Sequence, residues 1–78
     1  MGWSKVVLRE FLDGKGISPN SYSLNFDKDE AFCINQVGGE WLVYYSERGE
    51  RNELGWGKSE AQALNILKLF VLEAAQKI

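Results

Sequence analysis

The chain has no histidine among its 78 residues. Without imidazole, neither a Ser-His or Cys-His nucleophile pair nor a histidine-containing metal site can form. Carboxylate pairs such as Asp27 with Asp29 lie in segments expected to be polar turns, where water would solvate both acids and leave neither pKa raised for catalysis. We therefore expect a protein that is not an enzyme and that uses no cofactor and no metal.

Cysteine and long apolar segments are also scarce. Cys33 is the only cysteine, so no internal disulfide can form, whereas a small secreted domain usually carries two or more. Apolar stretches such as residues 69–72 fall far short of the roughly 20 apolar residues that cross a bilayer. Residues 6–8 are too few for the core of a signal peptide. We expect a soluble, cytoplasmic protein that does not enter a membrane.

The composition, with 45% hydrophobic and 26% charged residues, is typical of a globular chain, and the length allows one small domain over residues 1–78. Its net charge of −2 is unevenly spread, because residues 20–60 hold eight acids and four bases while the flanks are basic. Nucleic-acid binders normally present a basic face. The acidic centre therefore favours a basic protein as partner, unless the acids serve only solubility.

Apolar residues at helical spacing predict an amphipathic helix at each end of the chain. The first covers residues 4–13 and ends at Gly14 and Gly16, which can adopt positive φ. Ser59 and Gln62 have the spacing of a capping box and mark the start of the last helix.

The centre of the chain has the alternation and glycine turns of β-strands, and Trp56 is expected to be buried near its end. A polar break at residues 27–30, the Gly38-Gly39 pair and a charged turn at residues 47–53 separate the strands. The predicted strands are residues 22–26, 31–37, 40–46 and 54–57. Together the segments predict an α+β domain in the order helix, three- or four-stranded antiparallel sheet, helix, with both helices on one face.

The strand over residues 40–46 is apolar on both faces. One face carries Trp41, Val43 and Tyr45 and the other Leu42 and Tyr44, and the sequence does not tell which of them the helices cover. The face that the helices leave is either a place where a partner binds or a surface covered by a terminus or a long arginine side chain.

The segment Trp-Leu-Val-Tyr-Tyr-Ser-Glu-Arg-Gly-Glu-Arg at residues 41–51, followed by Ser-Glu-Ala-Gln-Ala at residues 59–63, resembles small immunity proteins of bacterial polymorphic-toxin and contact-dependent growth inhibition systems. The resemblance covers roughly residues 22–75. It implies a short, cytoplasmic, non-catalytic α+β protein that neutralises one cognate toxin domain, often a nuclease.

This resemblance and the acidic charge together predict a partner-binding surface on the strand and its turn. Acidic residues would guide a basic toxin domain and an aromatic residue would hold it, thereby occluding the toxin active site. In the alternative interpretation the turn is structural, with Glu47 and Arg48 paired and Gly49 supplying positive φ. The candidate contact residues are Trp41, Tyr44, Tyr45, Glu47, Arg48, Glu50, Arg51 and Glu53.

Two other functions remain as alternatives. Leu69 and Leu72 fall on the polar side of the last helix, where they would contact the first helix, remain exposed or form the seam of a homodimeric adaptor or regulatory module. Residues 55–60 resemble the start of the second helix of double-stranded RNA-binding domains. That family presents lysines there, whereas Lys58 is followed by Glu60 in this chain, so RNA is the less favoured ligand.

Overall fold

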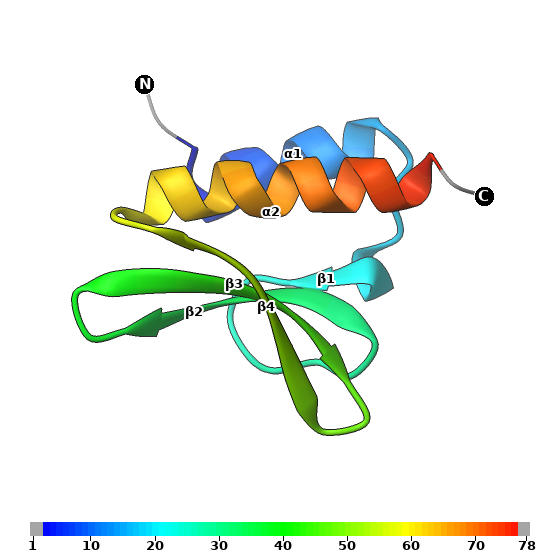
Figure 1. Ribbon diagram of the computed structural model, residues 1–78. Helices are drawn as coiled ribbons and strands as arrows, with labels where there is room; N and C mark the ends of the chain where they lie inside the picture. The colour runs from blue at the N-terminus through cyan, green and yellow to red at the C-terminus, as the bar shows by residue number, and fades with distance from the viewer. Residues whose placement is uncertain (1–2, 77–78) are drawn as a thin grey trace.

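A computed structural model describes residues 3–76 of the chain. Both helices lie on one face of a four-stranded sheet with strand order β1-β2-β3-β4 (Figure 1). The expected α+β architecture is confirmed. The elements are α1 (Lys5–Gly14), the 3-10 turn η1 (Pro19–Ser21), β1 (Tyr22–Ser23), β2 (Ala31–Val37), β3 (Glu40–Glu47), β4 (Glu50–Gly57) and α2 (Glu60–Ala75).

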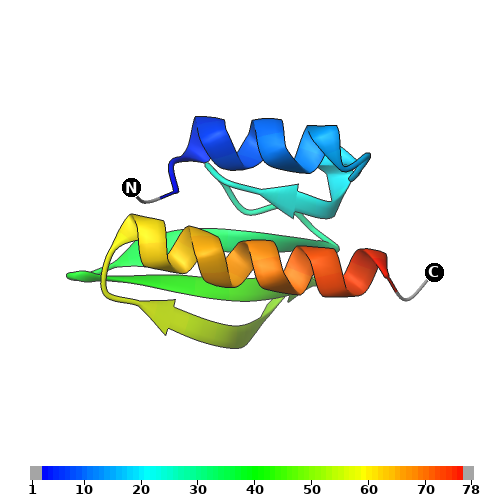
Figure 2. The ribbon, with the colours of Figure 1, turned by 90° about the horizontal axis from the view of Figure 1, so that it is seen from above.

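Serine hydroxyls begin both helices. Ser4 Oγ accepts a hydrogen bond from the Val7 amide, and Ser59 Oγ accepts one from the Gln62 amide, each at 3.2 Å. Gln62 Oε1 in turn accepts a 2.7 Å hydrogen bond from the Lys58 amide. These caps fix the helix starts where the sequence predicts them. The helices run side by side in the same direction, so their C-terminal ends lie at the same end of the molecule (Figure 2).

The first strand differs from the expectation. The sequence pattern predicts an antiparallel strand over residues 22–26, but β1 contains only Tyr22 and Ser23 and pairs with β2 in parallel. The Ser23 hydroxyl donates a 2.6 Å hydrogen bond to the Phe26 carbonyl. This turn ends the strand and leaves Phe26 67% exposed. The chain then passes beneath the sheet before β2 begins, so the sheet is mixed rather than wholly antiparallel (Figure 1).

The β3–β4 hairpin is tighter than expected. Residues 47–53 were predicted to form a charged turn, but Glu47 pairs with Glu50, and only Arg48 and Gly49 connect the strands. Their φ angles are 52° and 82°, the positive values that a two-residue hairpin turn needs. The prediction was wrong because the charged residues of β4 were taken as a turn. Charged side chains are also common on edge strands such as β4, where they oppose pairing with other chains.

The end of β4 packs against the start of α2. A Cβ atom on Gly57 would lie 2.6 Å from the backbone nitrogen of Ala63, so the helix approaches the strand as closely as glycine allows. Trp56 pairs with Leu42 on the opposite face of the sheet and is 43% exposed. Its predicted burial is wrong, because the helices cover only the other face.

Each face of the sheet carries its own apolar cluster. The larger one lies between the sheet and the helices, and the smaller one lies on the far face. Buried residues of the helix-side cluster are Leu8, Leu12, Tyr22, Leu24, Ile34, Val43, Ala63, Leu64, Leu67 and Val71. Those of the far-side cluster are Ala31, Cys33, Leu42 and Tyr44.

Candidate functional site

The far face of β3 is closed by the loop that connects β1 to β2. We call residues 24–30 of this loop the strap. The Cys33 thiol donates a 3.6 Å hydrogen bond to the Lys28 carbonyl in the strap, and the Tyr44 hydroxyl donates one to Asp27. The Arg51 guanidinium lies 4.5 Å from the centroid of the Tyr44 ring. The alternative interpretation, in which a long arginine side chain helps to cover this face, is therefore confirmed.

Tyr44 is consequently not available as a contact residue, and its predicted place in the partner-binding surface is wrong. Its side chain is only 1% exposed, because the strap and Arg51 lie over it. Burial, followed by the hydrogen bond to Asp27, raises the pKa of Tyr44 above its ordinary value. The hydroxyl therefore stays protonated and acts as the donor to Asp27.

The strap is held by a second acid and by an ion pair. Asp27 Oδ2 lies 2.9 Å from the Arg51 guanidinium, and Asp29 Oδ1 accepts a 2.7 Å hydrogen bond from the Arg48 amide. The hydrogen bond from Tyr44 and then the contact with Arg51 hold the pKa of Asp27 below its ordinary value. Arg51 and the Arg48 backbone thus both take part in holding the strap.

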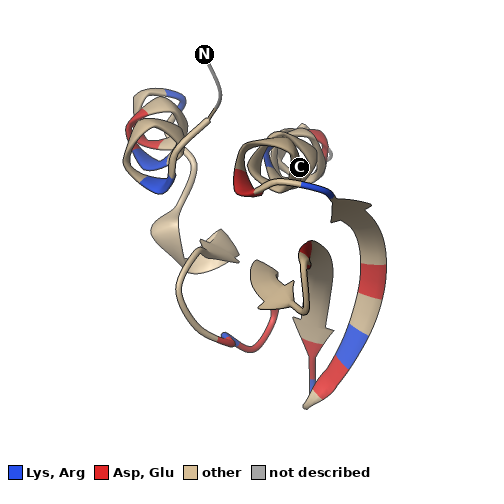
Figure 3. Ribbon diagram, turned by 90° about the vertical axis from the view of Figure 1, so that its left-hand side faces the viewer, with Lys and Arg blue, Asp and Glu red and all other residues tan. Residues whose placement is uncertain are grey.

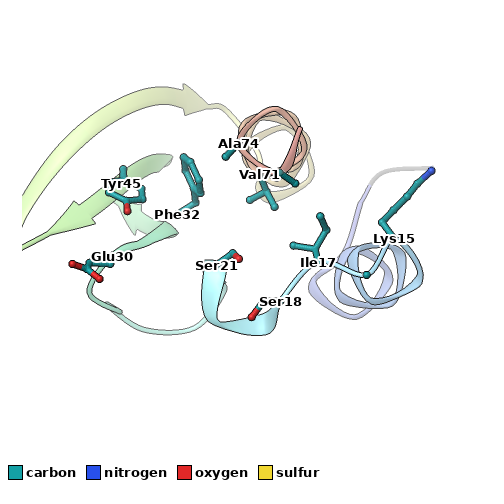
Figure 4. A pocket seen from close by; sticks show the side chains of 11 residues that line it. Lys15, Ile17, Ser18, Ser21, Glu30, Phe32, Tyr45, Val71 and Ala74 are labelled. Carbon is teal, nitrogen blue, oxygen red and sulfur yellow. The ribbon is translucent and has the colours of Figure 1, made fainter. Parts of the chain in front are cut away.

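An open groove of about 510 Å³ lies at the end of the molecule where both helices finish. We call it the acidic groove after Glu30 in its lining and Glu47 close to it, although Lys15 also lines it. Figure 4 shows Tyr45 and Glu30 at one end, Val71 and Ala74 of α2 along one side, and Lys15 at the other end with its amino group pointing away. The remaining lining residues are Gly16, Ile17, Ser18, Ser21, Phe32 and Ala75. The groove is within the roughly 300–1,000 Å³ range of ligand sites.

Aromatic rings form one wall of the acidic groove. Phe32 and Tyr45 are cross-strand partners on β2 and β3, with ring centroids 4.9 Å apart and planes at 64°. Phe70 of α2 stacks behind Phe32 at 6.4 Å. Edge-to-face pairs of this kind are favourable and hold each ring in place. Tyr45 is half-buried, so its ring remains accessible from the groove.

Carboxylates lie near the Tyr45 end of the groove. Glu30 lies in its lining and has a φ of 55°. Burial, followed by the negative charges of Glu47, Glu30 and Asp29, raises the pKa of Tyr45. Acidic segments are visible on the strap and on the β3–β4 hairpin, interspersed with basic ones (Figure 3). Glu30 in the lining and Glu47 farther along β3 therefore place negative charge near the aromatic wall.

The other predicted contact residues divide between different surfaces. Trp41 shares the helix-side face with Tyr45 but lies at the opposite end of β3, half-buried beside Gly57 and packed against the helix-side cluster. Glu50 pairs with Glu47 and is exposed. Arg51 lies on the far face, where it contacts Asp27 of the strap, and the exposed Glu53 is the cross-strand partner of Tyr44 on that face.

Glu53 and the turn have local structural contacts. Glu53 Oε1 accepts a 3.2 Å hydrogen bond from Trp56 Nε1. Gly49 supplies positive φ in the hairpin turn, as the structural interpretation of the turn expected. Of the eight predicted residues, Tyr45 alone lines the acidic groove. The exposed Glu47 lies two residues beyond it on the same face of β3, and the other six lie elsewhere.

The predicted dimer seam on α2 is not continuous. Leu69 is 56% exposed and faces away from the sheet, whereas Leu72 is half-buried and packs against the helix-side cluster. A single exposed leucine is normal on a protein surface and indicates no interface by itself.

Sequence reasoning missed Phe32, Glu30 and the helix residues of the groove. The Gly38-Gly39 turn could have placed Phe32 opposite Tyr45, since Phe32 lies six residues before Gly38 and Tyr45 six residues after Gly39. Glu30 was taken as part of a polar break, and nothing local marks it as a groove residue. Ile17 and Val71 meet there only through tertiary packing.

No family model, curated protein or solved structure matches this chain. Within residues 3–76, no helix has the length and apolar character needed to span a membrane. The same residues contain no group of three or more cysteine or carboxylate side chains placed to hold a metal ion.

Proposed function

We propose that this protein is a bacterial immunity protein that binds a cognate toxin domain in the cytoplasm and blocks its active site. The observation that carries the proposal is the acidic groove, in which the accessible Tyr45 ring lies against Phe32 and shares the lining with Glu30, while the exposed Glu47 lies two residues farther along β3. A hydrophobic anchor framed by charge of one sign is the arrangement expected for a protein that binds a basic partner.

The two parts of the groove contribute differently to binding. The exposed carboxylates of Glu30 and Glu47 would attract a basic surface over distance and accelerate association, and salt would screen this effect. The half-buried Tyr45 ring would be covered in the complex and would slow dissociation. Occlusion by a rigid surface needs no catalytic group on the immunity protein, in agreement with the absence of histidine.

The proposal is tested by capture and rescue. Tagged protein is incubated with lysates of related toxin-bearing strains, and retained proteins are identified by mass spectrometry. Each candidate is then expressed in a sensitive host, alone and together with the chain. We expect one toxin domain that arrests growth alone and is neutralised by co-expression.

A charge-matched pair of variants links the rescue to the groove. Glu30→Lys with Glu47→Lys should lose rescue, whereas Glu10→Lys with Glu40→Lys, which changes two exposed acids elsewhere, should retain it. The proposal is wrong if no captured protein is toxic, or if the chain fails to protect against every toxic protein that it captures.

A further inference from the structure

Both helices direct their C-terminal ends at the acidic groove. Residues 15–17, which follow α1, and Ala74 and Ala75 in the last turn of α2 line it. The C-terminal end of a helix carries about half a negative charge, which a cation nearby would offset. Neither helix has a basic side chain in its last turn. The amino group of Lys15 points away from the groove and lies 5.6 Å from the Phe11 ring (Figure 4).

The side chains at the opposite end of the groove add charge of the same sign. Glu30 lines the mouth, and the Tyr45 ring stands beside it (Figure 4). Glu47 follows Tyr45 by two residues on the same face of β3, so its carboxylate adds to the negative field there. Two helix C-terminal ends and the Glu30 carboxylate therefore meet at a groove that has an aromatic wall, and Lys15, which also lines it, points its amino group away.

We propose that the acidic groove receives one arginine side chain of the partner, with its guanidinium against the Tyr45 ring, between Glu30 and the C-terminal end of α2. This assignment rests on the proposed function for the identity of the partner. Arginine fits better than lysine because its planar, weakly hydrated guanidinium stacks on aromatic faces and forms paired hydrogen bonds with a carboxylate. Its methylene stem would lie along Val71 and Ala74.

The assignment is tested without the toxin. The full chain, labelled with ¹⁵N, is titrated with the peptide acetyl-Leu-Arg-Leu-amide and with the same peptide carrying citrulline, the neutral isostere of arginine. The arginine peptide should shift the amide signals of Phe32, Tyr45 and Ala74 in a saturable manner. The citrulline peptide should bind roughly five-fold more weakly or worse, the effect of one partly exposed charge pair.

Two matched variants locate the binding. Glu30→Gln preserves the shape of the side chain and should lower the affinity for the arginine peptide by a similar factor. Glu40→Gln removes an exposed acid at the far end of β3 and should leave its affinity unchanged. Equal affinity for both peptides, or shifts confined to residues outside the groove, would overturn the assignment.

Failure of this inference and failure of the proposed function are separable. If the arginine peptide binds in the groove and no toxin is captured, the proposed function is wrong while the site stands. If a toxin is captured and neutralised equally well by wild type and by Glu30→Gln, and neither peptide binds in the groove, the arginine site is wrong while the immunity function stands.

Discussion

The hydroxyl of Tyr44 donates a hydrogen bond to Asp27, which lies 17 residues earlier in the chain. This contact fastens the strap across the far face of the sheet and buries a tyrosine that the sequence placed at a partner-binding surface. It also leaves the other face of β3, at the Tyr45 end, as the accessible aromatic position. The strap therefore decides which of two adjacent tyrosines is available for binding.

We expect Tyr44→Phe to lower the free energy of unfolding by about 1 kcal/mol, the net value of one hydrogen bond. The ring still fills its place, so the loss reports on the bond to Asp27. Asp27→Asn should also lower the free energy of unfolding, because it removes the ion pair with Arg51. Solvent partly screens this ion pair, so the loss should be small. Urea denaturation measures both. Glu10→Gln, on the exposed side of α1, is the control, and a loss as large in the control would contradict the role of the strap.

Acid should weaken the strap through Asp27. Its pKa is lowered in the folded state, so its contribution to stability is fully present above the unfolded value of about 3.9 and is lost as the pH falls through the lower folded value. The stability difference between wild type and Asp27→Asn should therefore be constant near neutral pH and shrink below pH of about 4. Denaturant titrations across this range measure it. A stability difference between wild type and Asp27→Asn that grows in acid would contradict the prediction.

Gly57→Ala should destabilise the protein by about 1–3 kcal/mol, because the added methyl group would meet the backbone of Ala63. Gly39→Ala offers the matched change, since a Cβ atom there meets nothing within 4 Å and its backbone does not require glycine. Thermal unfolding of both variants checks the prediction. Equal melting temperatures would mean that β4 and α2 can separate slightly at no cost.

The homodimer alternative is tested through Leu69. Because Leu72 packs inward, we expect sedimentation of a monomer at micromolar concentration, and we expect Leu69→Ser to leave sedimentation unchanged. A concentration-dependent dimer that Leu69→Ser abolishes would favour the adaptor function instead.

The elements marked by local chemistry were predictable from the sequence. Ser4 and Ser59 mark the helix starts through bonds to amides three residues away, and the helix-sheet-helix order follows. The parallel β1 was not predictable, because the strap is held by Tyr44 and Arg51, which are distant in sequence. The length of β4 was missed for a different reason: charges at an edge strand look like those of a turn.

The candidate site was predictable only in part. Tyr45 and Glu47 follow from the aromatic strand and its acidic end. The groove also contains Glu30, Val71 and Ile17. Tertiary packing of the two helix ends against the strap brings these residues to the groove, and no spacing in the sequence indicates it. Tyr44 was misplaced because alternation gives the two faces of a strand without saying which one the rest of the chain will cover.

The most direct test of the account is the inhibition of the captured toxin domain by purified protein at low and at high salt. Wild type should inhibit in equimolar amounts and more tightly at low salt. Glu30→Lys with Glu47→Lys should inhibit at least ten-fold less at low salt, with a smaller difference at high salt, whereas Glu10→Lys with Glu40→Lys should resemble wild type. Equal inhibition by both double variants at low salt would contradict the claim that the acidic groove binds the toxin.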